Sequence, residues 1–265
     1  MNASVSIIVG VYNGEKYLAE LLDSILSQTS YAWICICVND GSTDSSLSIL
    51  ECYAKKDSRF KIVSRQNGGV GAARNTGIDA FDSKYIMFAD QDDKLLPSAV
   101  ATALSAIEDS GTDIVRFQSN KHMRKSNAVW ERIYRRDAIR DVRFPHITGG
   151  EDNAFLWELD LLGLKTTEIP DELYWNRTNN GSFSHAVSPK YIGNVFAGYR
   201  SMIAAGRRNH LSTWRLFAKL FSPVFWFSLS IVVKRHSLAN LRTLLPELTR
   251  LMTFTFFNHK EALHV

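Results

Sequence analysis

Cysteine is scarce in this sequence, with three residues among 265: Cys35, Cys37 and Cys52. We predict Cys35 and Cys37 on one face of a strand and Cys52 on a helix. That spacing fits neither a disulfide framework nor a zinc site. We therefore expect core thiols in a reducing compartment.

The sequence also lacks a hydrophobic run long enough to cross a membrane. The candidate segment, Leu220–Val233, has 14 residues without a charged side chain and is interrupted by Pro223. A spanning helix needs about 20 apolar residues. This segment is expected to lie in a membrane interface or to pack as an ordinary helical hairpin. Residues 1–4 run directly into a predicted strand, so we expect no signal peptide.

Charge is distributed unevenly along the chain. The net charge is +4, but in residues 207–265 nine Lys and Arg outnumber two Asp and Glu. A basic, aromatic C-terminal segment is typical of a membrane surface or a nucleic-acid contact. The length and the 45% hydrophobic content fit one large domain, or one domain with an appendage.

Apolar runs and helical patterns alternate in the first third of the chain. Strands are predicted at Val5–Val11, Trp33–Val38 and Phe60–Ser64 and in the apolar run from Tyr85 up to the carboxylates, with helices ending near Gln28, Lys56 and Phe81. The strands show no clean alternation, which is typical of strands covered on both faces. The fold class is therefore α/β, a mainly parallel sheet between helices.

Polar residues follow three of these strands. Tyr12, Asp40 and Asp90 each come at or just after a strand end, and ligands of open α/β sheets bind outside the carboxyl ends of the strands. We expect these residues to line one crevice. The loop Gln66–Asn75 has three glycines, which permit close backbone approach to a ligand. Its spacing matches neither the dinucleotide fingerprint nor the P-loop.

The fourth strand ends in Asp90-Gln91-Asp92-Asp93. Side chains two apart in a strand point the same way, so Asp90 and Asp92 can converge while Gln91 turns aside. Carboxylate oxygens suit Mg²⁺ or Mn²⁺, and Mg²⁺ is often held by one or two carboxylates together with substrate phosphates. The pattern indicates a metal–diphosphate site. The alternative is a solvated acidic turn, with Asp93 assisting the helix after Pro97.

The remainder of the chain is less regular. We predict a helix from Pro97 to about Asp109, strands at 113–117, 129–133, 165–168 and 173–177, and a short basic helix at 134–141. A loop at 146–150 leads into a helix that begins with Glu151 and Asp152. Acidic residues in a first turn also favour the helix dipole, so capping is the alternative role for this pair. From Pro189 the pattern is helical.

Five motifs, in order, resemble those of the family 2 glycosyltransferases with the GT-A fold, and the resemblance covers roughly residues 4–185. They are Val5–Tyr12 with Asn13-Gly14, Asn39–Asp44, Asn67-Gly68-Gly69 with Ala73-Arg74-Asn75, Asp90–Asp93, and Gly150-Glu151-Asp152 with Phe155.

The resemblance implies a nucleotide-diphosphate-sugar donor, a divalent cation (Mn²⁺ or Mg²⁺) and inversion at the anomeric carbon. Tyr12 would stack on the base, Asp40 would accept a hydrogen bond from it, and Arg74 would lie near the base or diphosphate. Asp92 would bind the metal, with His185 a weaker candidate for metal or diphosphate. Asp152 would be the general base, beside Glu151. The full donor-binding set is Val9, Tyr12, Asp40, Asn67, Arg74, Asp90 and Gln91.

The domain assignment combines this resemblance with the basic, aromatic composition of the C-terminal segment, which matches no specific family. Residues 1–206 would form the catalytic domain, with a nucleotide-sugar half at 1–118 and an acceptor half at 119–206, and residues 207–265 a basic helical tail that contacts the inner face of the cell membrane. The acceptor would be a glycan or lipid-linked molecule of bacterial cell-surface polysaccharide or lipopolysaccharide synthesis, with no nucleic acid involved. UDP-sugar is the expected donor.

Basic residues between 116 and 143 suggest an acidic or phosphate-bearing acceptor; a solvated basic face is the alternative. They are Arg116, Lys121, Arg124, Lys125, Arg132, Arg135, Arg136, Arg140 and Arg143. Two other functions would have different sequence features. A sugar-phosphate nucleotidyltransferase would open with a Gly-rich, basic loop after its first strand, which this chain lacks. A degenerate nucleotide-sugar-binding or scaffold protein would have lost carboxylates, and none is visibly lost.

Overall fold

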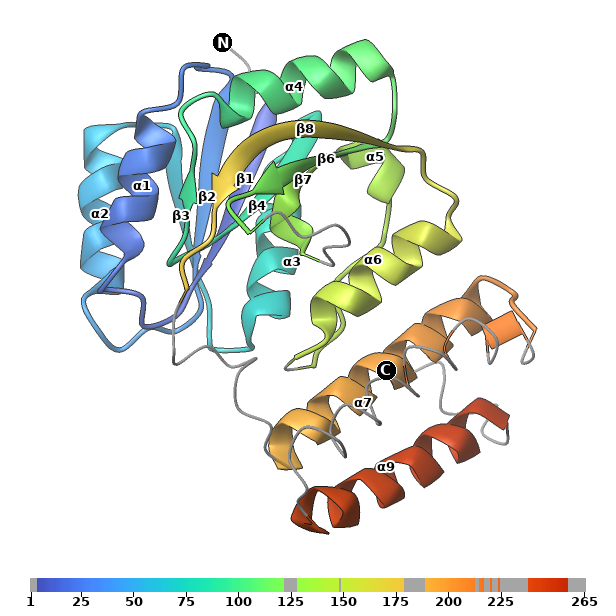
Figure 1. The fold of residues 1–265 in the computed structure, drawn as a ribbon. Coiled ribbons are helices and arrows are strands. Elements are labelled where there is room, and N and C mark those ends of the chain that lie inside the picture. The colour runs from blue at the N-terminus through green and yellow to red at the C-terminus, as the bar shows by residue number, and fades with distance from the viewer. Residues whose placement is uncertain are drawn as a thin grey trace. The chain divides into compact units, whose positions relative to one another are not determined.

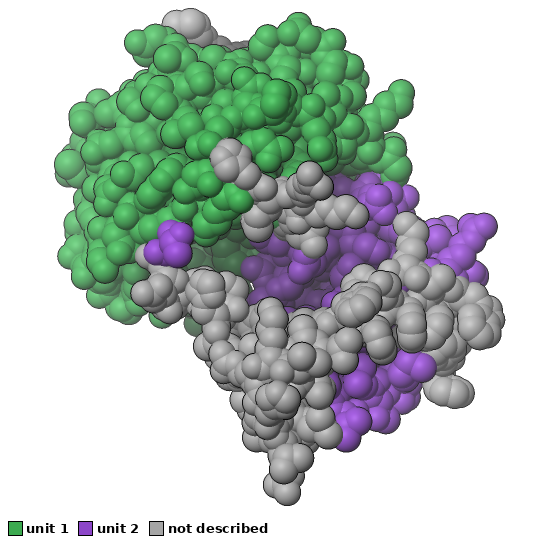
Figure 2. Space-filling model, viewed as in Figure 1, with its two compact units in different colours: residues 1–144, 163–177 green, residues 145–162, 178–265 purple. Residues whose placement is uncertain are grey.

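The structure is a computed structural model that describes residues 4–121, 128–147, 149–178, 189–212, 215–216, 220, 224 and 238–256. The chain forms two compact units (Figure 2). Unit 1 comprises residues 1–144 and 163–177, and unit 2 comprises residues 145–162 and 178–265. This division differs from the predicted boundary at 206, because the segment 145–162 groups with the C-terminal helices.

Unit 1 is built on a sheet whose described strands follow the order β3-β2-β1-β4-β7-β6-β8-β5 (Figure 1). Strands β1 to β4 are parallel neighbours, whereas β7 is antiparallel to β4 and to β6. The mainly parallel α/β sheet is therefore confirmed. The strands are β1 (Val5–Val11), β2 (Trp33–Asn39), β3 (Phe60–Ser64), β4 (Tyr85–Asp90), β5 (Lys94–Leu95), β6 (Ile114–Ser119), β7 (Arg132–Arg135) and β8 (Thr166–Trp175).

Helices cover both faces of the sheet. Odd-numbered residues of β1 such as Ile7 and Val9 share a core with α1, α2 and α4. On the opposite face α3 approaches β1 so closely that a Cβ on Gly77 would overlap Ile8, which explains a glycine inside this helix. Burial on both faces accounts for the apolar runs without alternation. The helices of unit 1 are α1 (Leu18–Leu26), α2 (Ser46–Lys56), α3 (Val70–Ala80), α4 (Ala99–Ser110) and α5 (Arg136–Ile139).

Three local predictions need correction. The two strands expected at 165–168 and 173–177 are one strand, β8, which pairs in parallel with β6 across a register irregularity. Residues 129–131 form a short 3-10 helix, and the strand begins at Arg132. The two-residue strand β5 was not predicted, because periodicity cannot reveal so short an element.

Unit 2 is helical in its described part, with α6 (Glu151–Leu161), α7 (Pro189–Arg208) and α9 (Leu238–Phe256). Its core contains Phe196 of α7, Leu244 of α9 and Leu220, with Val224 packed against it. Most of the segment 220–233 lies outside the described residues, but these two members pack internally, as in the hairpin alternative. No helix among the described residues combines the length and apolar character needed to cross a membrane.

Candidate donor-binding and catalytic site

The strand ends that carry the predicted site residues meet at one edge of the sheet of unit 1. β1 lies between β2 and β4, with Val11 opposite Asn39 and Gly10 opposite Asp90. The amide of Asp40 donates a hydrogen bond to the carbonyl of Val11 at 2.8 Å, which continues the ladder beyond β2. The parallel arrangement thus brings residues 50 and more positions apart to the same edge, as expected.

Gln91 fixes the turn after β1. Its Oε1 accepts a hydrogen bond from the Tyr12 amide at 2.9 Å, and its Nε2 donates to the Tyr12 carbonyl at 3.1 Å. A Cβ on Gly14 would overlap the Gln91 side-chain amide, so a larger residue there would displace Gln91 from these two bonds. The Tyr12 side chain stays 48% exposed. This exposed ring on a fixed backbone is available for stacking on a ligand.

The loops after β1 and β2 are bonded to each other. The Thr43 amide donates to Asn13 Oδ1 at 2.8 Å. The Glu15 amide donates to Asp44 Oδ2 at 3.0 Å, and the Ser45 amide donates to Glu15 Oε2 at 3.0 Å. Reciprocal bonds of this kind hold the two loops in a defined relation at the site edge.

Asp40 is occupied by groups of the protein itself. Its carboxylate accepts hydrogen bonds from the amides of Gly68 and Gly69, at 3.1 and 2.8 Å, and pairs with Arg65 Nε at 3.0 Å. The residue is only 2% exposed. Asp40 therefore anchors the glycine-rich loop that leads into α3, and Asn67 lies exposed on that loop.

Arg74 lies in α3 and is 3% exposed. Its Nη2 pairs with Asp90 Oδ1 at 2.8 Å, and its guanidinium lies 5.2 Å from the centre of the Phe144 ring. The Asp90 side chain is 32% exposed and so remains accessible from solvent. The structure thus joins two of the predicted donor-binding residues directly. Val9, also predicted, is fully buried in the core of the sheet.

Asp93 is the most enclosed carboxylate of the acidic turn, 2% exposed. Its oxygens accept hydrogen bonds from the Tyr174 hydroxyl and Asn176 Nδ2, each at 2.9 Å, and from the Arg177 amide at 2.8 Å. Burial, followed by the charge of Asp90 and, more weakly, Asp92, raises the pKa of Asp93 to about 7, against the opposing effect of its donors. These contacts engage Asp93 with the end of β8, not with the start of the helix after Pro97, which was its alternative role.

Asp92 is half-buried, and its carbonyl accepts a hydrogen bond from Arg177 Nε at 2.8 Å. Among the described residues no three His, Cys, Asp or Glu side chains are grouped to hold a metal. The donor set of Asp90 and Asp92 nonetheless fits Mg²⁺ or Mn²⁺, because these ions accept one or two carboxylates and complete their shell with water and substrate phosphate. The negative charges of Asp90 and Asp92 repel one another, and a bound cation would offset that repulsion.

The predicted base and its neighbour begin α6 in unit 2. Gly149 and Gly150, with φ of 89° and 86°, form the entry turn. Glu151 Oε2 accepts a hydrogen bond from the Gly149 amide at 2.7 Å, so Glu151 stabilises this turn. Asp152 lies half-buried in the first helical turn. His185, the weaker metal candidate, lies outside the described residues.

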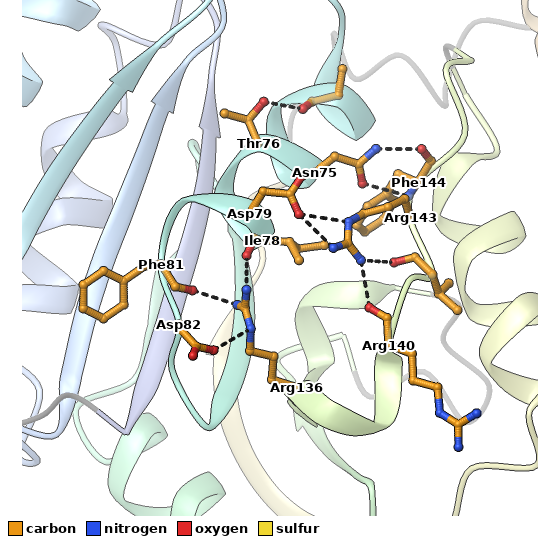
Figure 3. Close-up of polar contacts among 12 residues, drawn as sticks. Asn75, Thr76, Ile78, Asp79, Phe81, Asp82, Arg136, Arg140, Arg143 and Phe144 are labelled. Carbon is orange, nitrogen blue, oxygen red and sulfur yellow. Dashed lines mark hydrogen bonds and ion pairs between the residues drawn. The ribbon is translucent and has the colours of Figure 1, made fainter.

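Much of the predicted basic patch is engaged within unit 1. Figure 3 shows Arg136 and Arg143 directed at α3 and the segment after it. Arg136 donates to the carbonyls of Ile78 and Phe81 at 2.6 and 2.7 Å. Arg143 pairs with Asp79 at 2.8 Å. Further arginines are engaged in the same way, namely Arg116 with Glu168, Arg132 with the Ala128 carbonyl and Arg135 with the Thr112 carbonyl, whereas Arg124 and Lys125 lie outside the described residues.

Sequence reasoning missed Arg65, Tyr174, Asn176 and Arg177. The last three lie at or just after the end of β8, whose partner β5 was not predicted. The available signal was the run of hydrogen-bonding side chains from Tyr174 to Arg177 at a strand end, the same signal that had identified Asp40 and Asp90.

Comparison with known proteins identifies the family and the fold. The model of the family described as Glycosyl transferase family 2 matches residues 6–160. The putative glycosyltransferase EpsH of Bacillus subtilis is 30% identical over 241 residues, covering 78% of this chain and 70% of EpsH. The poly(ribitol-phosphate) beta-glucosyltransferase of Bacillus spizizenii is 39% identical over 114 residues, covering 42% of this chain and 18% of that protein.

Among solved structures, residues 1–349 of S. aureus TarS, in complex with UDP-GlcNAc, superpose with a TM-score of 0.80 at 22% identity. The match covers 96% of this chain and 82% of the TarS chain, and it shows that the fold is GT-A. The family match spans more than half of the chain, from the first strand to the helix that carries Glu151 and Asp152. The chain therefore belongs to glycosyltransferase family 2.

Proposed function

We propose that the protein is an inverting, metal-dependent glycosyltransferase that moves a sugar from a UDP-sugar to a hydroxyl of a glycan or lipid-linked acceptor. The observation that carries this proposal is the acidic turn at the end of β4, which lies beside the end of β1 at the same sheet edge as the end of β2 and keeps Asp90 accessible. The complex of TarS with UDP-GlcNAc supports the choice of donor class.

Donor binding is assigned to groups of unit 1. The exposed ring of Tyr12 would stack on the base. Arg74 and Asp90 would act together near the diphosphate and ribose, since they are already paired at 2.8 Å. Asn67 would contact the base from the glycine-rich loop, Asp40 would serve the site by holding that loop in place, and Gln91 would contribute by fixing the backbone of Tyr12.

Asp92, with Asp90 beside it, would hold Mn²⁺ or Mg²⁺, and His185 remains a further candidate. A bound divalent cation stabilises the negative charge that develops on a departing diphosphate. No general acid is then needed on the leaving-group side. The paired guanidinium of Arg74 would add positive charge near the same phosphates.

Asp152 is proposed as the general base. It would take the proton of the acceptor hydroxyl as the acceptor oxygen attacks the anomeric carbon from the face opposite the nucleotide. The bond from the anomeric carbon to the diphosphate oxygen breaks, the electron pair leaves with the nucleoside diphosphate, and the configuration inverts. Glu151 would act as its neighbour, because its own carboxylate is engaged by the Gly149 amide.

The acceptor and the location are also proposals. We assign the reaction to bacterial cell-surface polysaccharide or lipopolysaccharide synthesis at the inner membrane face, supported by the basic balance of residues 207–265 and by a relative that acts on poly(ribitol-phosphate). Flotation of the full chain with vesicles tests the membrane contact. Binding to vesicles with anionic lipid, lost in neutral vesicles, is the expected result; no binding to either would overturn it.

Donor hydrolysis tests the activity. Purified protein with Mn²⁺ is incubated with UDP-, GDP- and dTDP-sugars, and released nucleoside diphosphate is recorded with and without chelator. Slow release from a UDP-sugar that stops on chelation is expected. Asp152→Asn should keep UDP and Mn²⁺ binding but lose the release, whereas Asp160→Asn, near the other end of α6, should retain both. Absence of nucleotide binding by the wild type would reject the proposal.

A further inference from the structure

The end of β8 holds the acidic turn of the proposed donor site in place. The Tyr174 hydroxyl donates to Asp93 Oδ2 at 2.9 Å and accepts a hydrogen bond from the Asp90 amide, also at 2.9 Å. The turn closes on itself through the Asp93 amide and the Asp90 carbonyl at 3.1 Å. One phenol therefore joins the first and last residues of the Asp90–Asp93 turn.

The surroundings allow the Tyr174 side chain little freedom. The residue is fully buried, and its ring stacks on Trp130 with centroids 4.4 Å apart and an interplanar angle of 20°. Its backbone is opposite Leu95 in the pairing of β8 with β5, and β5 follows the acidic turn directly. The hydroxyl is consequently fixed from two sides, by ring packing and by strand register.

The residues that follow Tyr174 strengthen the same attachment. Asn176 donates to Asp93 through its side chain, and Arg177 donates to Asp93 through its amide and to the Asp92 carbonyl through Nε at 2.8 Å. Arg177 is itself held by Glu20 at 2.9 Å and by the Tyr17 ring at 4.1 Å. Every donor to the Asp93 carboxylate named above comes from residues 174–177.

We propose that Tyr174 is a positioning residue for the donor site, holding Asp90 and Asp92 in the arrangement that binds the cation and the nucleotide diphosphate. This inference rests on the function proposed above. Two carboxylates that must share a cation repel one another before it binds, so a turn without an anchor would spread and bind more weakly. The Tyr174 hydroxyl supplies the anchor without contacting the ligand, because it is enclosed between Asp93 and the backbone of Asp90.

The test uses Tyr174→Phe, which removes the hydroxyl and keeps the ring against Trp130. The matched control is Tyr134→Phe, another fully buried tyrosine of unit 1, whose hydroxyl donates to the Val129 carbonyl at 3.0 Å. In Tyr174→Phe we expect amide hydrogen exchange at Asp90–Asp93 to rise about tenfold, the size of one lost hydrogen bond. The KM for donor and the half-saturating Mn²⁺ concentration should rise about tenfold, with a smaller change in kcat.

The outcomes separate this inference from the proposed function. Unchanged exchange at the turn, or faster exchange with unchanged binding of UDP and Mn²⁺, would overturn the positioning role. Faster exchange throughout unit 1, equal to that in Tyr134→Phe, would overturn it as well. A wild type that binds UDP and Mn²⁺ but transfers no sugar would count against the proposed activity alone. If Tyr174→Phe fails to fold, Asp93→Asn, which alters the same junction while conserving its shape, must show the same localised exchange and weaker Mn²⁺ binding.

Discussion

Two carboxylate sites lie at the ends of β2 and β4, the strands on either side of β1, yet they differ in what surrounds them. Asp40, after β2, is 2% exposed and accepts two amides and an arginine of its own chain. Asp90, the last residue of β4, gives one oxygen to Arg74 and keeps 32% of its side chain exposed, and Asp92 beside it is half-buried. The first site is closed by the protein, whereas the second still presents carboxylate oxygen to solvent.

The difference shows that position at a strand end does not by itself assign a role. Parallel topology brings both sites to the same edge. What separates them is the number of donors that the chain supplies, because each internal hydrogen bond to a carboxylate occupies a lone pair that a ligand would need. On this comparison Asp40 contributes chiefly to loop structure and the Asp90–Asp93 turn chiefly to ligand binding, and three substitutions test it.

The largest effect is expected at Asp92. Asp92→Ala should lower metal-dependent donor turnover by about 1,000-fold, about 4 kcal/mol of transition-state stabilisation, because the cation would lose a carboxylate ligand. The free energy of unfolding should change by less than about 1 kcal/mol, since a partly exposed side chain is removed. Initial rates across a Mn²⁺ titration and thermal unfolding of the same preparation measure the two quantities. If Asp92→Ala lost about 4 kcal/mol in the free energy of unfolding as well as in transition-state stabilisation, Asp92 would stabilise the fold, as we propose for Asp40.

The intermediate effect is expected at Asp40. Asp40→Ala leaves the Gly68 and Gly69 amides and Arg65 without their carboxylate, and we expect a loss of about 2 kcal/mol in the free energy of unfolding. Arg65 is 28% exposed and keeps bonds to the Ala72 carbonyl and to Thr76, which limits the cost. Urea unfolding beside Asp92→Ala gives the comparison directly. If Asp40→Ala keeps wild-type stability and loses only nucleotide binding, the proposed distinction between the two sites fails.

Much of the fold was predictable because periodic apolar runs and turn residues determine it locally. The bounds of Phe60–Ser64 agree with the structure, as does the parallel pairing of the first four strands. The region after residue 110 was predicted less well. There β7 reverses direction, β8 joins two expected strands into one and β5 has two residues, and these features depend on long-range pairing that no local pattern contains.

The site was predictable as a set of residue types but not as a network. The carboxylates at strand ends identified Asp40, Asp90 and Asp92 as candidates. The pairing of Arg74 with Asp90 and the attachment of Asp93 to Tyr174 join residues 16 and 81 positions apart, and only the folded structure reveals them. The sequence could not decide whether the arginines between 116 and 143 bind an acceptor or form a solvated basic face. Several of their partners, such as Asp79 on α3 and Glu168 on β8, are distant in sequence.

The smallest of the three effects is expected at Arg136, a positively charged residue whose side chain is bonded within unit 1. Arg136→Ala removes bonds to the carbonyls of Ile78 and Phe81 near the end of α3 and should cost about 1–2 kcal/mol in the free energy of unfolding. The ion pair with Asp82 adds little, because that carboxylate is 97% exposed. Arg140→Ala is the matched control, since its exposed guanidinium points away from this cluster in Figure 3. A stable Arg136→Ala with a raised KM for acceptor would instead make Arg136 part of an acceptor-binding surface, open to ligand like Asp90 rather than closed like Asp40.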